Sequence, residues 1–139
     1  SFVQFDEHGN VNVSLIGSEY YGCGGYIDIC HAAKKIVFVG SFTAKGLDVT
    51  RNENTVTIKK EGSISKAVTD VSQITFSPRM VEEKDQEIMI VTERCVFSVI
   101  NNEVTITEIA EGINLERDIL SHMPFKPVIA DPIKQLTWD

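Results

Sequence analysis

Cysteine and histidine are scarce in this sequence, which holds three of each among 139 residues. Cys23, Cys30 and Cys95 form an odd, irregularly spaced set, which is a poor disulfide framework and predicts reduced thiols in a cytoplasmic protein. The histidines lie far apart along the chain, and neither a CxxC nor an HxxxH spacing occurs. We therefore expect no metal site.

A long hydrophobic run and an excess of positive charge are also missing. No apolar segment is long enough to cross a bilayer. No signal peptide, which would have a basic region followed by an apolar stretch, is visible. The net charge of −7 gives no cationic surface for nucleic acid. We expect neither a membrane nor a nucleic-acid partner. The chain opens on SFVQF without an initiator methionine, so we expect a processed or excised piece of a longer protein.

What the chain does contain, 42% hydrophobic and 24% charged residues, suits one globular domain over residues 1–139. The hydrophobic pattern predicts a mixed α/β fold. We expect a hairpin that turns at residues 8–10 and a short helix that starts at 26–28. The continuous apolar run at 35–42 is typical of a strand buried on both faces.

The second half of the chain is predicted to be rich in strands. Alternating segments with short polar turns predict antiparallel strands within 47–68, 73–77, 87–93, 95–102 and 103–110. A charged loop is expected at 81–87 and one later helix at 114–123, with Asn114 as its N-cap. The tail is predicted to be a short extension that docks on a neighbour through Ile133, Leu136 and Trp138.

Two positions could carry nucleophilic or acid–base chemistry. Glu93 lies between apolar strand segments and next to Arg94. We interpret these two as a surface-facing pair or a buried ion pair that fixes the sheet, with a catalytic carboxylate as the alternative. Cys23 precedes the predicted helix, where a thiolate is stabilised, so a nucleophilic pair with His31 is a second hypothesis. The simpler interpretation is that Cys23 is the small side chain that a glycine loop admits.

That loop, with Gly22, Gly24 and Gly25 directly before the predicted helix, needs a cause. Glycine loses more conformational entropy on folding than any other residue. One cause is a tight turn that packs the helix close to the sheet. The other is an anion or a developing oxyanion held by backbone N–H groups. The spacing is neither the P-loop pattern nor GxGxxG, so it leaves both explanations open.

Several segments together resemble a known family. These are DEHGNVNVSLIG, GCGGYIDICHAAKKIVFVGSFTAKGL, VSQITFS, IMIVTERCVFSV, ITEIAEGINLERDIL and MPFKPVI. Each is moderately specific, and their collinear order over nearly the whole chain is highly specific. The sequence resembles the C-terminal, β-type half of the family I CoA-transferases, and most closely the fused acetate or propionate CoA-transferases that act on short acyl-CoAs.

The resemblance implies the strand-rich C-terminal portion of a three-layer α/β/α domain. It also implies a ping-pong transfer of CoA between an acyl-CoA and a carboxylic acid through a glutamyl-CoA thioester, with no cofactor besides the CoA substrate. The loop Gly22, Cys23, Gly24 and Gly25 would then lie against the thioester, where its N–H groups stabilise the oxyanion. The N-terminal half of the same enzyme and further copies in a homo-oligomer are the expected partners.

The sequence departs from the family in two places. The catalytic glutamate belongs to a glutamate–glycine motif upstream of the GNVNVS hairpin, and the pairs at 61–62 and 111–112 lie in the wrong context. We therefore expect no catalytic residue in this chain and no activity of the chain alone. Lys45 stands where related enzymes tend to have a second glycine, which predicts a turn that tolerates a side chain in solvent. The alternative function is a non-catalytic, strand-rich interaction module.

Overall fold

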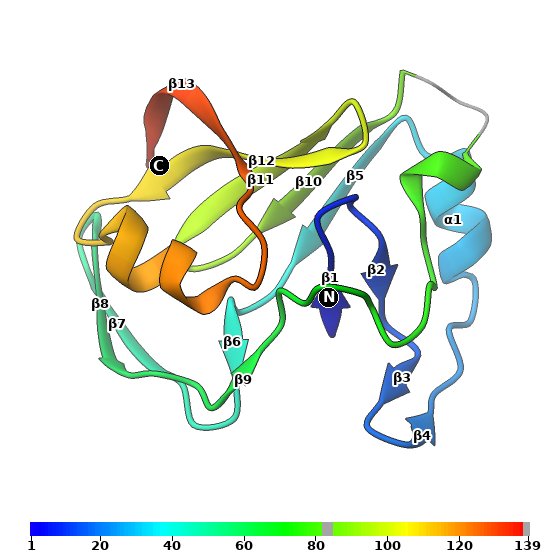
Figure 1. Cartoon of the computed structure of the whole chain (residues 1–139), viewed down its shortest axis with the longest axis horizontal. Helices are drawn as coiled ribbons and strands as arrows, with labels where there is room; N and C mark the ends of the chain where they lie inside the picture. The colour runs from blue at the N-terminus through cyan, green and yellow to red at the C-terminus, as the bar shows by residue number, and fades with distance from the viewer. Residues whose placement is uncertain (82–84, 138–139) are drawn as a thin grey trace.

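The molecule is built on a five-stranded sheet with the strand order β13-β12-β11-β10-β5 (Figure 1). The computed structural model describes residues 1–81 and 85–137. The sheet strands are β5 (Lys35–Val39), β10 (Glu87–Val91), β11 (Cys95–Ile100), β12 (Glu103–Ala110) and β13 (Val128–Leu136). This strand-rich sheet with few helices confirms the predicted mixed α/β class.

Short strands pair outside this sheet as β1–β2, β3–β4, β6–β9 and β7–β8. Their bounds are β1 Gln4–Phe5, β2 Val11–Asn12, β3 Leu15–Ile16, β4 Glu19–Tyr20, β6 Thr43–Ala44, β7 Asp48–Asn52, β8 Thr55–Lys60 and β9 Ile64–Ser65. The predicted first hairpin is confirmed, because Asp6 Oδ1 accepts the backbone N–H groups of His8 and Asn10 and closes the turn. Short polar side chains of this kind favour turns.

The single α-helix of the described residues is α1 (Tyr26–Ala32), which begins where the sequence predicts a helix. It packs on the buried face of the sheet, with the Tyr26 ring 6.0 Å from that of Phe38 and with Cys30 buried. The predicted later helix exists as a π turn over Leu115–Ile119 followed by a 3₁₀ turn over Leu120–His122. Asn114 caps it as predicted, since its side chain accepts the Arg117 N–H at 2.8 Å. A further 3₁₀ turn spans Pro78–Met80.

The observed strand pairing agrees with the predicted pairing in the middle of the sheet and differs from it at the two edge strands. The antiparallel run β10–β11–β12 is confirmed, whereas β5 pairs with β10 and β13 pairs with β12 in parallel. The predicted burial of β5 on both faces is wrong, because Ile36 and Phe38 are buried while Val37 and Val39 are 46% and 57% exposed. Only one face of this strand is covered by described residues.

Two other predictions fail because the segments concerned contact partners that are distant in sequence. Residues 73–77 form no strand, and Phe76 makes only an isolated bridge to Val11. Phe76 is almost fully buried, so the apolar pattern of this segment reflects core packing rather than a hydrogen-bonded ladder. The tail, predicted to be a short extension, is instead the sheet strand β13, which pairs with β12 and contains Ile133 and Leu136. Trp138 and part of the predicted charged loop lie outside the described residues.

The core lies on the face of the sheet that α1 covers. Six buried phenylalanine rings belong to it, and Phe5 contacts Phe97, Phe2 and Phe125 at centroid distances of 5.4, 5.8 and 6.3 Å. Segments far apart in sequence supply these rings, so the N-terminal hairpin and the residues after β5 are fixed to the sheet by apolar burial. No helix in the described ranges is long and apolar enough to cross a membrane.

The β7–β8 hairpin is held to the end of β12 by a close backbone approach at Gly112. Val56 N–H donates to the Glu111 carbonyl at 2.8 Å, and a Cβ on Gly112 would lie 2.5 Å from the Val56 oxygen. Gly112 also has φ +88°, a conformation that side chains resist. Glycine is therefore required here by both the backbone conformation and the packing.

We predict that Gly112→Ala destabilises the fold by about 2–3 kcal/mol, the sum of backbone strain and a clash with a hydrogen-bonded strand. Gly17→Ala is the matched control, because Gly17 has φ +61° but open space where a Cβ would lie. This control should cost only about 1 kcal/mol, from strain. Urea unfolding measures both, and equal losses would show that the approach at Gly112 adds nothing.

Candidate functional site

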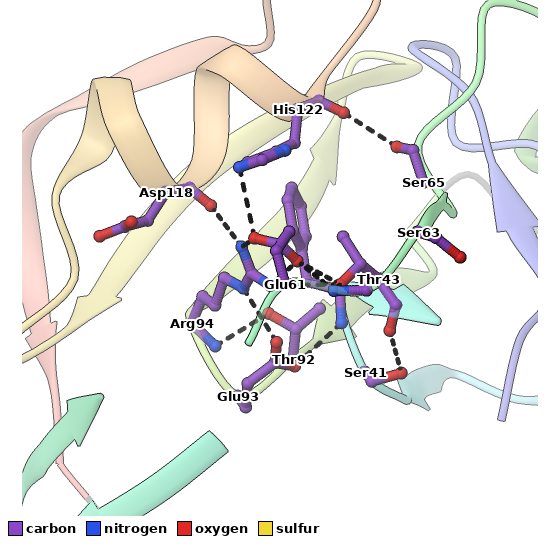
Figure 2. A network of polar contacts seen from close by, with 12 residues as sticks. Ser41, Thr43, Glu61, Ser63, Ser65, Thr92, Glu93, Arg94, Asp118 and His122 are labelled. Carbon is purple, nitrogen blue, oxygen red and sulfur yellow. Dashed lines mark hydrogen bonds and ion pairs between the residues drawn. The ribbon is translucent and has the colours of Figure 1, made fainter. Parts of the chain in front are cut away.

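The buried guanidinium of Arg94 is the centre of a network of polar contacts (Figure 2). Arg94 lies in the turn between β10 and β11 and is 0% exposed. The turn is shaped by Thr92, whose Oγ1 accepts the N–H groups of Arg94 and Cys95 at 3.1 Å. The Arg94 Cζ also lies 4.9 Å from the centroid of the Phe42 ring, a cation–π contact.

Glu61 forms a bidentate ion pair with Arg94. The Arg94 Nη2–Glu61 Oε1 and Nη1–Glu61 Oε2 distances are 2.6 and 2.8 Å. Glu61 Oε1 also accepts the Thr43 hydroxyl at 2.5 Å and the Gly62 N–H at 2.9 Å, and His122 Nε2 lies 3.3 Å from Oε2. Figure 2 shows Arg94, Thr43 and His122 converging on the carboxylate. Both oxygens are therefore fully engaged.

These contacts decide the protonation of Glu61. Burial alone would raise the pKa of its carboxyl group. The hydrogen bonds from Arg94 and Thr43, the Arg94 charge and the Gly62 N–H outweigh burial and lower the pKa from 4.5 to about 2. The carboxylate is thus ionised across the physiological range, but it is locked in place and is a poor nucleophile.

Glu93 completes the pairing of the guanidinium. Its Oε1 accepts Arg94 Nε–H at 2.9 Å, and its Oε2 accepts the backbone N–H of Phe42 at 2.9 Å. The interpretation of Glu93 and Arg94 as a buried ion pair is confirmed. From the sequence, Glu61 is only part of a glutamate–glycine pair in the wrong context. Its pairing with Arg94 was missed because the two residues lie far apart in the chain.

The predicted glycine loop lies at the surface, away from this network. Gly22, Gly24 and Gly25 are exposed and Cys23 is partly exposed. The loop is closed by the Tyr26 N–H, which donates to the Cys23 carbonyl at 3.0 Å. Gly24 has φ +52°, so the turn itself requires glycine there.

Packing within the chain does not explain the other two glycines of the loop. A Cβ on Gly22 would meet nothing within 4 Å, and one on Gly25 would meet only the Ile29 side chain at 3.6 Å. Among the described residues, the amide N–H groups of Gly24 and Gly25 donate no hydrogen bond. The helix also begins without a side-chain cap. The loop therefore presents free backbone donors in open space.

The pair of Cys23 and His31 is not assembled. His31 Nδ1 lies 2.8 Å from the Ile27 carbonyl one turn back, and its ring packs against Phe76 at 6.2 Å. No contact in the described structure joins it to Cys23. Across residues 1–81 and 85–137, no group of three or more His, Cys, Asp and Glu side chains could hold a metal ion.

Lys45 is exposed, as its place in a solvent-facing turn predicts. Its φ is +63°, the left-handed conformation that a glycine adopts without cost. The structure thus accommodates the lysine at a position with a backbone suited to glycine.

Comparisons with curated proteins and with solved structures relate this chain to known proteins. No family model matches the chain. It is 45% identical over 138 residues to a caffeate CoA-transferase of Acetobacterium woodii, covering 96% of this chain and 26% of that protein. It is 37% identical to the acetate CoA-transferase YdiF of Escherichia coli K12, covering 96% of this chain and 25% of YdiF.

Solved structures agree with these matches. The apoenzyme of the acyl-CoA transferase YdiF from Escherichia coli O157:H7 matches with a TM-score of 0.93 and 36% identity, over 97% of this chain and 26% of that one. Its thioester complex with CoA matches with a TM-score of 0.92. The chain spans about a quarter of the length of the proteins that it matches.

We predict that the ionised carboxylate of Glu61 stabilises the folded state by about 3 kcal/mol at neutral pH. This value follows from the lowering of its pKa, because each pKa unit corresponds to about 1.4 kcal/mol. Because the pKa is lower in the folded state, this stability is present above pH 4.5 and is lost as the pH falls towards 2. Glu61→Gln should therefore be destabilised at pH 7, and its difference from the wild type should shrink over that window.

The matched control is Glu111→Gln, at the other glutamate–glycine pair. Glu111 is exposed, and its carboxylate accepts a hydrogen bond from the Gln135 amide at 3.3 Å. The Glu111→Gln protein should unfold at the same urea concentration as the wild type at every pH tested. A Glu61→Gln protein whose deficit stays constant from pH 7 to pH 2 would show that charge pairing is not the source of this stability.

Proposed function

We propose that this chain is the C-terminal part of the β-type half of a CoA-transferase. The chain is homologous to a segment that makes up about a quarter of the length of each CoA-transferase that it matches. The enzyme would move CoA between a short-chain acyl-CoA, such as acetyl- or propionyl-CoA, and a carboxylic acid. The observation that carries the proposal is the 45% identity to a CoA-transferase over nearly the whole chain. The role of this segment would be to supply the glycine loop.

In the proposed reaction, the carboxylate of a glutamate attacks the thioester carbonyl and CoA leaves as a thiolate, which gives an acyl-glutamyl anhydride. The thiolate then attacks the glutamyl carbonyl, the acyl group leaves as a carboxylate, and a glutamyl-CoA thioester remains. An acceptor carboxylate reverses these steps and leaves as the new acyl-CoA. Each attack creates an oxyanion that needs hydrogen-bond donors.

The loop of Gly22, Cys23, Gly24 and Gly25 is suited to supply these donors. The N–H groups of Gly24 and Gly25 have no partner among the described residues and lie at the start of α1, where the helix carries partial positive charge. The space beside Gly22 and Gly25 is open, so a thioester can approach the backbone closely. Only backbone atoms of Cys23 would be used.

The attacking glutamate would come from outside this chain, and the two glutamate–glycine pairs present have structural explanations. Glu61 is locked by Arg94, Thr43 and the Gly62 N–H. A Cβ on Gly62 would lie 2.5 Å from the Ala44 oxygen, as one on Gly112 would from that of Val56. Both glycines are thus required by backbone packing, independently of any reaction.

The remaining expectations belong to the same proposal. The segment would act together with the N-terminal half of the same enzyme, within a homo-oligomer in the cytoplasm. Its substrates would be an acyl-CoA and a carboxylic acid, and it would need neither a metal nor a further cofactor.

We predict that Gly25→Ala in the full-length enzyme lowers kcat by on the order of 100-fold or more, because a methyl group enters the space of the thioester and disturbs an aligned donor. This substitution introduces no positive-φ strain, and the chain itself has room for the methyl group. Gly24→Ala should have a similar effect with about 1 kcal/mol of added strain. Steady-state kinetics and urea unfolding separate the two contributions.

The control for this experiment is Cys23→Ala, which should leave kcat within a few-fold of the wild type. The loss in the glycine variants should fall on kcat rather than on KM, since the donors act on the transition state. If Cys23→Ala abolished activity while Gly25→Ala were harmless, the thiol would carry the chemistry and the oxyanion role would be wrong.

We predict that the isolated chain does not transfer CoA, because the attacking glutamate is not among its residues. Incubation with acetyl-CoA and a second carboxylic acid should leave both unchanged by mass spectrometry. Turnover that survives in the Glu61→Gln and Glu111→Gln variants would show that another group of this chain is the nucleophile.

A further inference from the structure

The glycine loop is fixed at its two ends by different parts of the chain. Its C-terminal end continues into α1, which packs on the core through the ring of Tyr26. At its N-terminal end, the backbone N–H of Tyr21, directly before Gly22, donates to the Ser14 carbonyl at 2.8 Å. The position of Ser14 therefore determines where the chain enters the loop.

The β3–β4 hairpin, which lies between Ser14 and Tyr21 in the chain, buries little apolar surface. Ile16 and Tyr20 are 50% and 75% exposed. Figure 1 shows the hairpin projecting from the body of the molecule, with the chain running from β4 to α1. Apolar burial, which holds the N-terminal hairpin to the sheet, therefore contributes little to the position of this segment.

A buried amide shapes the chain between β2 and this hairpin. Asn12, at the end of β2, is 0% exposed. Its Oδ1 accepts the N–H groups of Ser14 and Leu15 at 3.1 and 3.0 Å. Its Nδ2 donates to the Leu15 carbonyl at 2.8 Å and to the Gln4 side chain at 2.9 Å. Both donors and both acceptor positions of the amide are used, so the turn at Ser14 has one defined geometry.

A hydroxyl from a distant segment, that of Thr75, attaches this turn to the body of the protein. Thr75 is 7% exposed, and its Oγ1 accepts the Val13 N–H at 3.0 Å and forms a hydrogen bond with the Ser14 hydroxyl at 2.7 Å. The Thr75 N–H donates to the Val11 carbonyl at 3.0 Å, and the next residue, Phe76, belongs to the core. Buried hydrogen bonds are directional, so they restrict Ser14 more narrowly than apolar contact would.

We propose that Thr75, together with Asn12, is a positioning residue for the glycine loop. This inference rests on the proposed function. The two side chains do not touch the substrate. They hold the Ser14 carbonyl where it receives the Tyr21 N–H, and so they aim the free N–H groups of the loop at the oxyanion. Misplacement of a catalytic group by about 1 Å lowers the rate by on the order of 100-fold, so a distant hydroxyl has a measurable effect on turnover.

Thr75→Val in the full-length enzyme tests this role, because it keeps the branched shape of the side chain and removes the hydroxyl. We expect kcat to fall by about tenfold or more and KM to stay within a few-fold, since the loop donors act on the transition state. Thr75→Ser keeps the hydroxyl and should retain most of the wild-type kcat. The control is Thr107→Val, which removes a hydroxyl that donates to the Val96 carbonyl in the sheet at 3.2 Å, and it should leave kcat unchanged. Urea unfolding verifies that each variant is folded under the assay conditions.

Amide hydrogen exchange of the same proteins gives a readout that does not depend on turnover. The Tyr21 N–H is bonded to the Ser14 carbonyl, so its exchange reports how firmly the entry to the loop is held. In Thr75→Val it should exchange at least about tenfold faster, while the N–H groups of α1 exchange as in the wild type. Thr75→Ser and Thr107→Val should match the wild type at Tyr21. A lowered kcat with wild-type exchange at Tyr21 would contradict the positioning role.

The outcomes separate this proposal from the proposed function. If the full-length protein transfers CoA and Thr75→Val keeps the wild-type kcat, the positioning role is wrong and the function stands. If the wild type transfers no CoA, the function is wrong and this role fails with it. Should Thr75→Val not fold, Ser14→Ala decides, because it removes only the partner hydroxyl and leaves the Val13 N–H bonded to Thr75. A several-fold lower kcat with faster exchange at Tyr21 would support the role, and wild-type values of both would overturn it.

Discussion

The structure depends on the full satisfaction of one buried cation. Removing a guanidinium from water costs several kcal/mol unless charge and hydrogen bonds replace the solvent. Arg94 meets this condition with two carboxylates, the Asp118 carbonyl at 2.8 Å and the Thr43 hydroxyl at 3.3 Å. These partners come from the segment after β5, the turn after β8, the β10–β11 turn and the 115–122 turns. One side chain therefore fixes four separate stretches at the ends of the sheet strands.

The apolar core and this polar network have different tasks. The aromatic rings around Phe5 and Phe97 hold the hairpins to the sheet, but apolar contact tolerates small shifts. Bidentate bonds to Arg94 and the bond from Phe42 N–H to Glu93 have strict geometry, so they set the path of the chain where it leaves β5. The glycine loop is separate from both. Its Cys23 and Gly25 carbonyls accept the N–H groups of Tyr26 and Ile29, while the N–H groups of Gly24 and Gly25 have no partner among the described residues.

Local signals in the sequence predicted local structure well. The Asp6 turn, the start of α1 and the Asn114 cap depend on residues within a few positions, and each is confirmed. The resemblance predicted the fold class. Features that depend on distant partners were missed: Glu61 in the Arg94 network, β13 as a parallel sheet strand, and the core role of Phe76. The apolar run of β5 predicted two covered faces, and the described chain supplies only one of them.

The parallel pairing of β5 and β10 has a consequence for the order of folding. Strands β10, β11 and β12 follow one another through short turns, so this meander can close at small entropic cost. Strand β5 can join it only after residues 40–86 have formed a large loop, and contacts of such long sequence separation slow folding. We therefore expect the meander to form first. The side of the sheet that carries Val37 and Val39 would then become ordered only after the meander.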